Sequence, residues 1–152
     1  MKTFTIILTF LVLFTGCADK NAFSRFSMSE KQELSANALA RSKIKFEDRV
    51  NGIVSIIYLN FVSPKEYSED EYFYVYAYVK NRDYKIRFLL NDEEPISVEE
   101  LPSTNTFTEL TSIDNDWNKY YLVRFPKQGD KLSFVLETGP YSSDTLKFEK
   151  DE

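Results

Sequence analysis

From about Ile44 onward, apolar side chains recur at every second position, which is the spacing of β-strands that bury one face. The clearest case is residues 72–79, which read Tyr-Phe-Tyr-Val-Tyr-Ala-Tyr-Val. Successive side chains of a strand point to opposite faces. We therefore expect the four tyrosines on one face of this strand, and the Phe, the Ala and both Val residues on the other.

Similar patterns predict more strands, at 50–62, 84–90, 96–101, 119–125, 131–138 and 145–149, with a weaker one at 107–110. Segment 50–62 is apolar on both faces, which is typical of a central strand covered on both sides. Gly52 indicates a bulge or a bend near its start. The short polar link at 81–83 predicts that strand 84–90 pairs antiparallel with strand 72–79.

A short helix is expected before the strands. Ser27 and Glu30 have the spacing of a capping box, and good helix formers continue to about Arg41. The apolar stripe of this helix is thin, with Leu34 and Leu39 as its main members. The helix is therefore interpreted either as a spacer or as a frayed linker without a specific partner.

About seven or eight short strands with no long helix between them predict a mainly β protein, built as an antiparallel β-sandwich. The spacing of the strands resembles that of immunoglobulin- or fibronectin-type sandwiches. This resemblance concerns architecture alone, since no pair of cysteines brackets Trp117. The sandwich is expected to occupy residues 46–152.

Composition agrees with one folded domain. The chain has 152 residues, with 13 Phe and 10 Tyr, and disordered chains are poor in aromatic residues. It has a single cysteine, so no disulfide can form within the chain. Its net charge of −5 opposes binding to nucleic acid, whose phosphates require clusters of Lys and Arg.

The first 17 residues carry the most specific motif. Lys2 precedes an apolar run at 4–13, which is too short to span a membrane, since a spanning helix needs about 20 residues, but has the length of a signal-peptide core. Leu13-Phe14-Thr15-Gly16-Cys17 follows. This pattern resembles the lipobox of bacterial lipoproteins, although that family usually has Leu where Phe14 stands.

The resemblance implies cleavage between Gly16 and Cys17 and acylation of the Cys17 thiol. Ala18, in place of an aspartate, favours the outer membrane, on the periplasmic side of the envelope. The implied organisation is a signal peptide at 1–16, an acylated tether with a short helix at 17–45, and the β domain. Two alternatives stay open: an ordinary secretory signal, or a buried N-terminal helix in a protein that is not secreted.

Loss of Lys2 with the signal peptide would leave 18 of the 19 basic residues against 24 acidic ones, a net charge of −6. Such a charge opposes electrostatic attraction to anionic lipid head groups. The lipid chains are therefore the expected link to the membrane.

The candidate binding face consists of aromatic residues: Tyr72, Tyr74, Tyr76, Tyr78 and Trp117. Tyrosine offers rigid, amphipathic contact area, so this face is a candidate platform for a ligand or a partner. The alternative is that a second layer, or the helix near 34–39, covers the stripe as ordinary core.

A second candidate lies in the loop before strand 119–125. Asp114, Asp116 and Asn118 have the alternate spacing that opens a calcium loop. Lys119 stands where that loop needs Gly, and Phe125 where it needs a bidentate Glu. Asp and Asn are also common turn residues, so we interpret the segment as a turn and expect no metal and no cofactor.

Few residues could carry catalysis. The chain has no His, hence no imidazole base near neutral pH, and an acylated Cys17 would leave no thiol. The sequence therefore predicts a non-enzymatic, lipid-anchored envelope protein with an interaction or structural role, and possible partners are other envelope proteins. The alternative function is binding of a carbohydrate or small ligand on the tyrosine-rich face.

Overall fold

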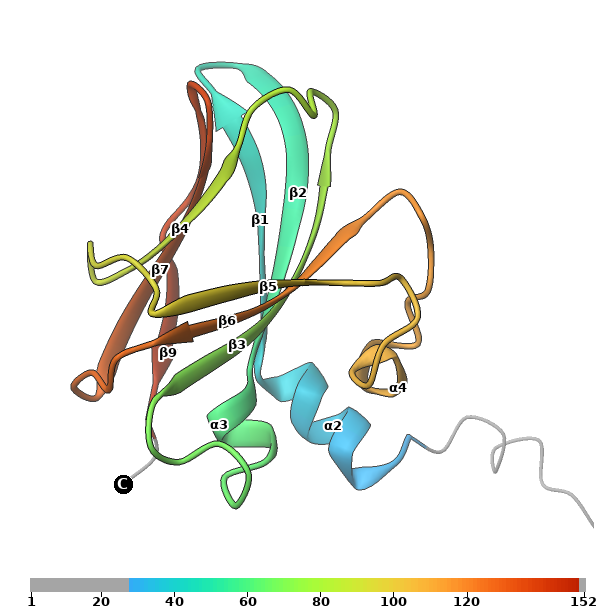
Figure 1. Cartoon of the computed structure of the whole chain (residues 1–152), viewed down its shortest axis with the longest axis vertical. Helices are drawn as coiled ribbons and strands as arrows, with labels where there is room; N and C mark the ends of the chain where they lie inside the picture. Colours follow the sequence, from blue (N-terminus) through green and yellow to red (C-terminus); the bar gives the residue numbers. More distant parts are fainter. Residues whose placement is uncertain (1–27, 151–152) are drawn as a thin grey trace, which may run out of the picture.

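The computed structural model describes residues 28–150, and these form a nine-stranded antiparallel sheet with three short helices (Figure 1). The helices are α2 (Glu30–Asn37), α3 (Leu59–Val62) and α4 (Thr108–Thr111). The strands are β1 (Leu39–Phe46), β2 (Arg49–Tyr58), β3 (Glu71–Val79), β4 (Ile86–Leu90), β5 (Ser97–Leu101), β6 (Lys119–Phe125), β7 (Lys131–Thr138), β8 (Tyr141–Ser143) and β9 (Leu146–Glu149).

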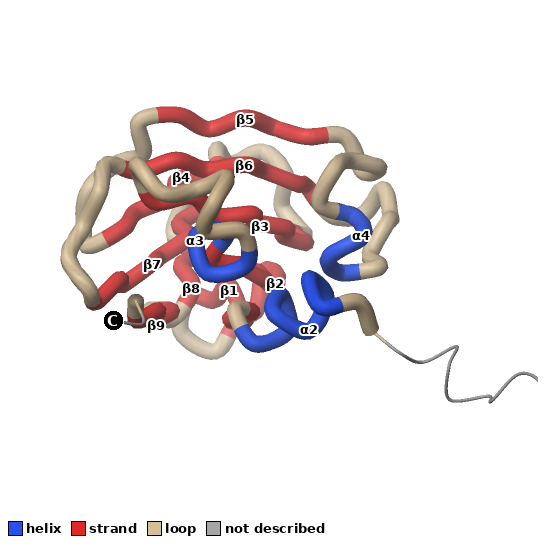
Figure 2. The backbone as a smooth tube through the Cα atoms, turned by 90° about the horizontal axis from the view of Figure 1, so that it is seen from below, coloured by secondary structure: helices blue, strands red, loops and turns tan. Residues whose placement is uncertain are grey.

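The sheet curves into a half-barrel (Figure 2). Its strand order is β4-β7-β8-β1-β2-β3-β6-β5, and β9 lies off this path and pairs with residues 131–134 of β7. Side chains from both sides of the curve meet in an inner core, where Phe73 of β3 lies 5.0 Å from Phe134 of β7, measured between ring centroids. Strands β4 and β5 end the path and therefore border the opening of the half-barrel.

A second core lies on the outer face of β2, β3 and β6. Tyr74, Tyr76 and Tyr120 pack there against residues of the helical segments, including Leu59 of α3 and Phe107 beside α4. The three helices gather at one end of the molecule, at the bottom of Figure 1. No helix among residues 28–150 has the length and apolar character needed to cross a bilayer.

The prediction of a mainly β, antiparallel protein is confirmed. Strand 72–79 is present, with its Phe, Ala and Val side chains in the inner core. The bulge near Gly52 is also confirmed, because the pairing of β1 with β2 shifts there: Ile44 opposes Gly52 while Lys45 opposes Val50. The division into two sheets and the immunoglobulin-like topology are not confirmed, since the nine strands belong to one sheet.

The predicted pairing of strand 84–90 with strand 72–79 is wrong. In the structure β3 is a central strand with β2 and β6 on its two edges. No edge of β3 remains for β4, which crosses to the far end of the sheet and pairs with β7. The link at 81–83 is tight, with the Asp83 amide donating to the Asn81 side chain at 3.0 Å, but it redirects the chain rather than forming a hairpin.

The N-terminal boundary of the sheet also differs from the prediction. The helix ends at Asn37, and β1 starts at Leu39, inside the segment 17–45 for which the sequence predicts a tether. The cap is Ser29, whose hydroxyl accepts a hydrogen bond from the Gln32 amide at 3.2 Å. The predicted cap at Ser27, the signal peptide and the lipobox lie outside the described residues.

Two other short segments are helical turns. The weak strand expected at 107–110 is α4, and the end of the expected strand 50–62 is α3. In α3, the Asn60 side chain donates to the Asp70 carbonyl at 2.6 Å and accepts from the Tyr72 amide at 2.8 Å. These bonds join the end of β2 to the start of β3 and so turn the chain away from an extended path.

Candidate functional site

The tyrosine stripe is not a continuous exposed platform. Tyr74 and Tyr76 are 0% and 5% exposed and belong to the outer core, whereas Tyr72 is half-buried and Tyr78 is 41% exposed. Leu34 of α2 packs against the same core. The alternative that other elements cover the stripe as ordinary core is therefore confirmed for its two central rings.

The surroundings of Tyr74 are those of a core residue. Its ring lies 4.9 Å from Phe107 and stacks with Tyr120 at 6.4 Å, measured between centroids. Its hydroxyl accepts a long hydrogen bond of 3.4 Å from the Asn105 amide group. Burial raises the pKa of Tyr74 to about 12. A neutral, packed phenol in this position stabilises the fold and is not accessible to a ligand.

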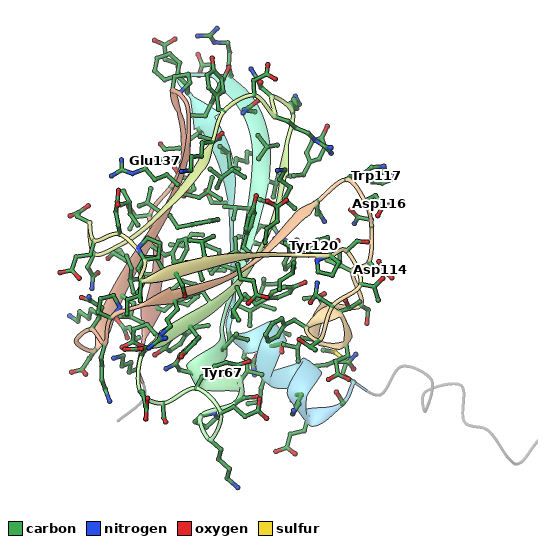
Figure 3. The ribbon with its side chains drawn as sticks, viewed as in Figure 1. Tyr67, Asp114, Asp116, Trp117, Tyr120 and Glu137 are labelled. Carbon is green, nitrogen blue, oxygen red and sulfur yellow. The ribbon has the colours of Figure 1, made fainter. Side chains whose placement is uncertain are left out.

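Trp117 lies apart from the tyrosines, on the loop before β6, and its side chain is 74% exposed (Figure 3). The loop is held by Asn115, whose side-chain oxygen accepts from the amides of Trp117 and Asn118 at 3.1 and 3.0 Å. The Asn115 backbone in turn exchanges hydrogen bonds of 3.1 and 3.0 Å with the Tyr120 hydroxyl. The indole is therefore presented from a loop with a defined backbone.

Trp117 lines the larger part of a groove at the opening of the half-barrel. This part is a cleft of about 590 Å³, and side chains of both end strands border it, including Phe88 of β4 and Val98 of β5. Arg82 donates to the Trp117 carbonyl across it at 3.2 Å. Tyr84 and Tyr121 add further aromatic surface.

A smaller cleft of about 400 Å³ continues along the same opening. The two clefts share four lining residues: Lys85, Ile86, Phe88 and Val98. We call the combined feature the β4–β5 groove. Its walls come from the two end strands, from the link between β3 and β4, and from β6 with the loop before it. Its largest exposed apolar side chains are Trp117, Tyr84 and Val98, which are 74%, 42% and 45% exposed. Exposed apolar surface gathered in a concave site is typical of a binding surface.

The charges around the groove are mixed. Arg87 of β4 pairs with Glu94 at 2.9 Å, and Lys119 of β6 pairs with Glu100 of β5 at 3.4 Å. Burial, and then the charge of Glu100, raise the pKa of Tyr121 to about 12. The Tyr121 hydroxyl is therefore neutral near pH 7.

A separate polar cluster surrounds Glu71, which is 1% exposed. One carboxylate oxygen accepts from the Gln128 amide at 2.9 Å and from the Lys150 ammonium at 2.5 Å. The other accepts from the Tyr58 hydroxyl at 2.6 Å, and burial followed by this bond raises the pKa of Tyr58. Both oxygens are occupied by donors, so the cluster fastens the end of β9 to β3.

The Asp-Asn loop contains a turn in the structure, as the sequence predicts. Asp114 accepts hydrogen bonds from the Thr104 hydroxyl at 3.1 and 3.3 Å, and the Asn115 side chain closes the turn. Within residues 28–150, no group of three or more His, Cys, Asp or Glu side chains has the arrangement of a metal site.

Sequence reasoning selected Trp117 but missed the groove that it lines. The missing partners are Tyr84, Ile86 and Val98, which come from strands 84–90 and 96–101. Two signals in the sequence pointed to this region. Both strands are short, and 96–101 combines Ile and Val with two glutamates, a composition that suits the edge of a sheet.

Comparison of the chain with protein-family models, with curated proteins and with solved structures found no match.

Proposed function

We propose that this protein is a lipid-anchored, non-enzymatic component of a bacterial cell envelope that binds another envelope protein through the β4–β5 groove. The observation that carries the binding role is the groove itself, a concave opening lined by exposed Trp117, Tyr84 and Val98. The lipobox-like segment ending at Cys17 supports the location in the envelope. Ala18, in place of an aspartate, favours the periplasmic side of the outer membrane.

The anchor would keep the groove near the bilayer. Between Cys17 and the first residue of α2, the chain can extend at most about 45 Å, from about 3.5 Å per residue. Two or three acyl chains bind a membrane durably without any basic patch, which suits the acidic composition of this chain. A partner bound in the groove would therefore be held at a distance from the membrane that is limited by the length of this link.

Mass spectrometry of the mature N-terminus tests the anchor. We expect a chain that starts at Cys17 and carries the mass of a diacylglyceryl group, and we expect Cys17→Ser to stay unprocessed or to leave the membrane fraction. An unmodified thiol at Cys17 in the mature protein would contradict the anchor.

Photo-crosslinking in cells tests the groove. A photoreactive amino acid at Val98 should capture a discrete protein, whereas the same group at Ile53, which is 46% exposed on β2, should not. Equal capture from both positions would contradict a specific partner at the groove.

A second candidate function is binding of a carbohydrate or small ligand in the same groove, favoured by the exposed rings of Trp117 and Tyr84 that line it. Exposed aromatic rings offer flat apolar surface to such ligands. Because Trp117 is the one Trp of the chain, its fluorescence reports binding directly. Saturable changes with a panel of neutral and acidic oligosaccharides would favour this function over a protein partner.

A further inference from the structure

Strand β5 forms one wall of the β4–β5 groove and has an open edge. It pairs with β6 on one side, and the described residues contain no strand paired with its other side. Its first four residues are exposed, with Val98 at 45%. An edge of this kind carries unsatisfied backbone N–H and C=O groups that can pair with an added strand.

Strand β4, the opposite wall, is more protected. Leu90 and Glu93 form a bridge with hydrogen bonds of 2.9 and 3.0 Å, so the loop after β4 folds back on its end. Arg87 forms ion pairs with Glu94 at 2.9 Å and with Glu137 at 3.2 Å. An added strand therefore has better access to β5.

The sequence limits the length of pairing. Pro95 and Pro102 flank β5, and proline cannot donate to a ladder. The available edge is thus about five residues, or about 17 Å at 3.4 Å per residue. An occupant of this edge is a short extended segment rather than a whole sheet.

The two faces of β5 define the side chains of the occupant. Val98 and Glu100 line the groove, so an added strand would place apolar residues against Val98 and Phe88. Glu99 alternates with these residues and lies on the other face, where it is exposed. Glu99 is the charged residue of β5 on that face, which favours a basic residue beside it in the occupant.

Self-association through β5 is disfavoured by the same charges. Two antiparallel copies of β5 paired about their centre would set Glu99 against Glu99, and like charges directly opposite each other are destabilising. The strand is therefore suited to a partner of the opposite charge rather than to a second copy of this chain.

We propose that β5 accepts an extended segment of a partner protein as an added β-strand, and that this segment alternates apolar residues, which face the groove, with Lys or Arg, which face Glu99. This inference rests on the proposed partner-binding function and specifies the chemistry of the partner.

The test uses the full chain purified in detergent and three capped peptides. The basic peptide is Thr-Lys-Val-Lys-Val-Lys-Thr, the acidic peptide has Glu in place of each Lys, and a third has Pro in place of the central Lys of the basic peptide. Trp117 fluorescence measures affinity, and hydrogen exchange of the amides of residues 97–101 locates the bound strand.

We expect the basic peptide to bind and to slow exchange at 97–101, and the Pro-containing peptide to bind about tenfold more weakly or not at all. Glu99→Lys should weaken the basic peptide about tenfold and strengthen the acidic one. Glu33→Lys, the same charge change at an exposed position of α2, should leave both affinities unchanged.

Equal binding of the basic and acidic peptides, unaltered exchange at 97–101, or no reversal of preference in Glu99→Lys would overturn strand addition. The crosslinking experiment at Val98 is independent of these peptides. If Val98 captures a protein in cells while the peptide test fails, strand addition is overturned and the partner-binding function stands; if Val98 captures nothing specific, the partner-binding function itself falls.

Discussion

Gly52 shows how one residue connects three strands. It lies at the bulge where the pairing of β1 with β2 shifts, and a Cβ added there would lie 2.0 Å from the carbonyl oxygen of Tyr78 on β3. That oxygen is backbone and cannot move aside as a flexible side chain can. The position therefore requires glycine because of the close approach of a neighbouring strand.

We predict that Gly52→Ala lowers the free energy of unfolding by about 3 kcal/mol, since overpacking against backbone forces the sheet to shift. Urea denaturation followed by circular dichroism measures the change. Gly129→Ala is the matched control, because a Cβ at Gly129 would have no heavy atom within 4 Å. Equal stability of the two variants would contradict the close packing at Gly52.

The buried phenols make stability depend on alkaline pH. Burial raises the pKa of Tyr74 and Tyr121 from 10.0 to about 12. Above pH 10 the unfolded chain loses these protons while the folded chain keeps them. The contribution to stability is thus complete below pH 10 and is lost as the pH rises toward 12.

We predict that raising the pH from about 8 to about 11 lowers the free energy of unfolding by about 1 kcal/mol for each such tyrosine. Tyr74→Phe should show a smaller loss over this range, measured by urea denaturation at both pH values. Tyr78→Phe, at a 41% exposed position, should follow the wild type. The buried-phenol account fails if both variants show the wild-type pH dependence.

At the scale of elements, α2 is a cover for the sheet rather than a spacer. Its capping box is complete. The Ser29 hydroxyl accepts from the Gln32 backbone amide at 3.2 Å, and the Gln32 side-chain oxygen accepts from the Ser29 backbone amide at 2.9 Å. The side-chain amide group of Gln32 also donates to the Glu109 carbonyl at 2.9 Å, which ties α2 to α4. The thin apolar stripe of the helix was sufficient for docking because Leu34 and Ala38 meet a core of aromatic rings.

We predict that Leu34→Glu detaches α2, lowers the free energy of unfolding by about 2 kcal/mol and exposes Tyr74 and Tyr76 to nitration by tetranitromethane. Mass spectrometry after digestion locates the nitrated rings. Met28→Glu is the control, since Met28 is 56% exposed. Protection of both rings in Leu34→Glu would show that α2 is not their cover.

At the scale of the whole molecule, the inner and outer cores share the same strands. Strand β2 contributes Val54 to the inner core and Ile57 to the outer core, and β3 contributes Phe73 and Tyr74 in the same way. Strand β6 also has residues in both cores. Melting either core would expose the other face of these strands to water. The described part of the chain should therefore unfold as one unit.

We predict a single urea transition with coincident midpoints for far-ultraviolet circular dichroism, which follows the strands, and near-ultraviolet circular dichroism, which follows the packed tyrosines. Transitions that separate would indicate that the helices and the outer core melt independently of the half-barrel.

The amino-acid sequence by itself determined the mainly β class, the position of most strands and the inner core, since alternation at every second residue is a local property of the chain. It also located the bulge at Gly52 and selected Trp117 for the candidate site.

Only the tertiary structure decided which strand pairs with which, that Tyr74 and Tyr76 are buried in an outer core with residues of the helical segments, and that Trp117, Tyr84 and Val98 line one groove. The physical reason is that these features join residues far apart in the chain. An alternating pattern assigns each side chain to one of two faces, but it does not say which element will cover that face or which edge will stay open.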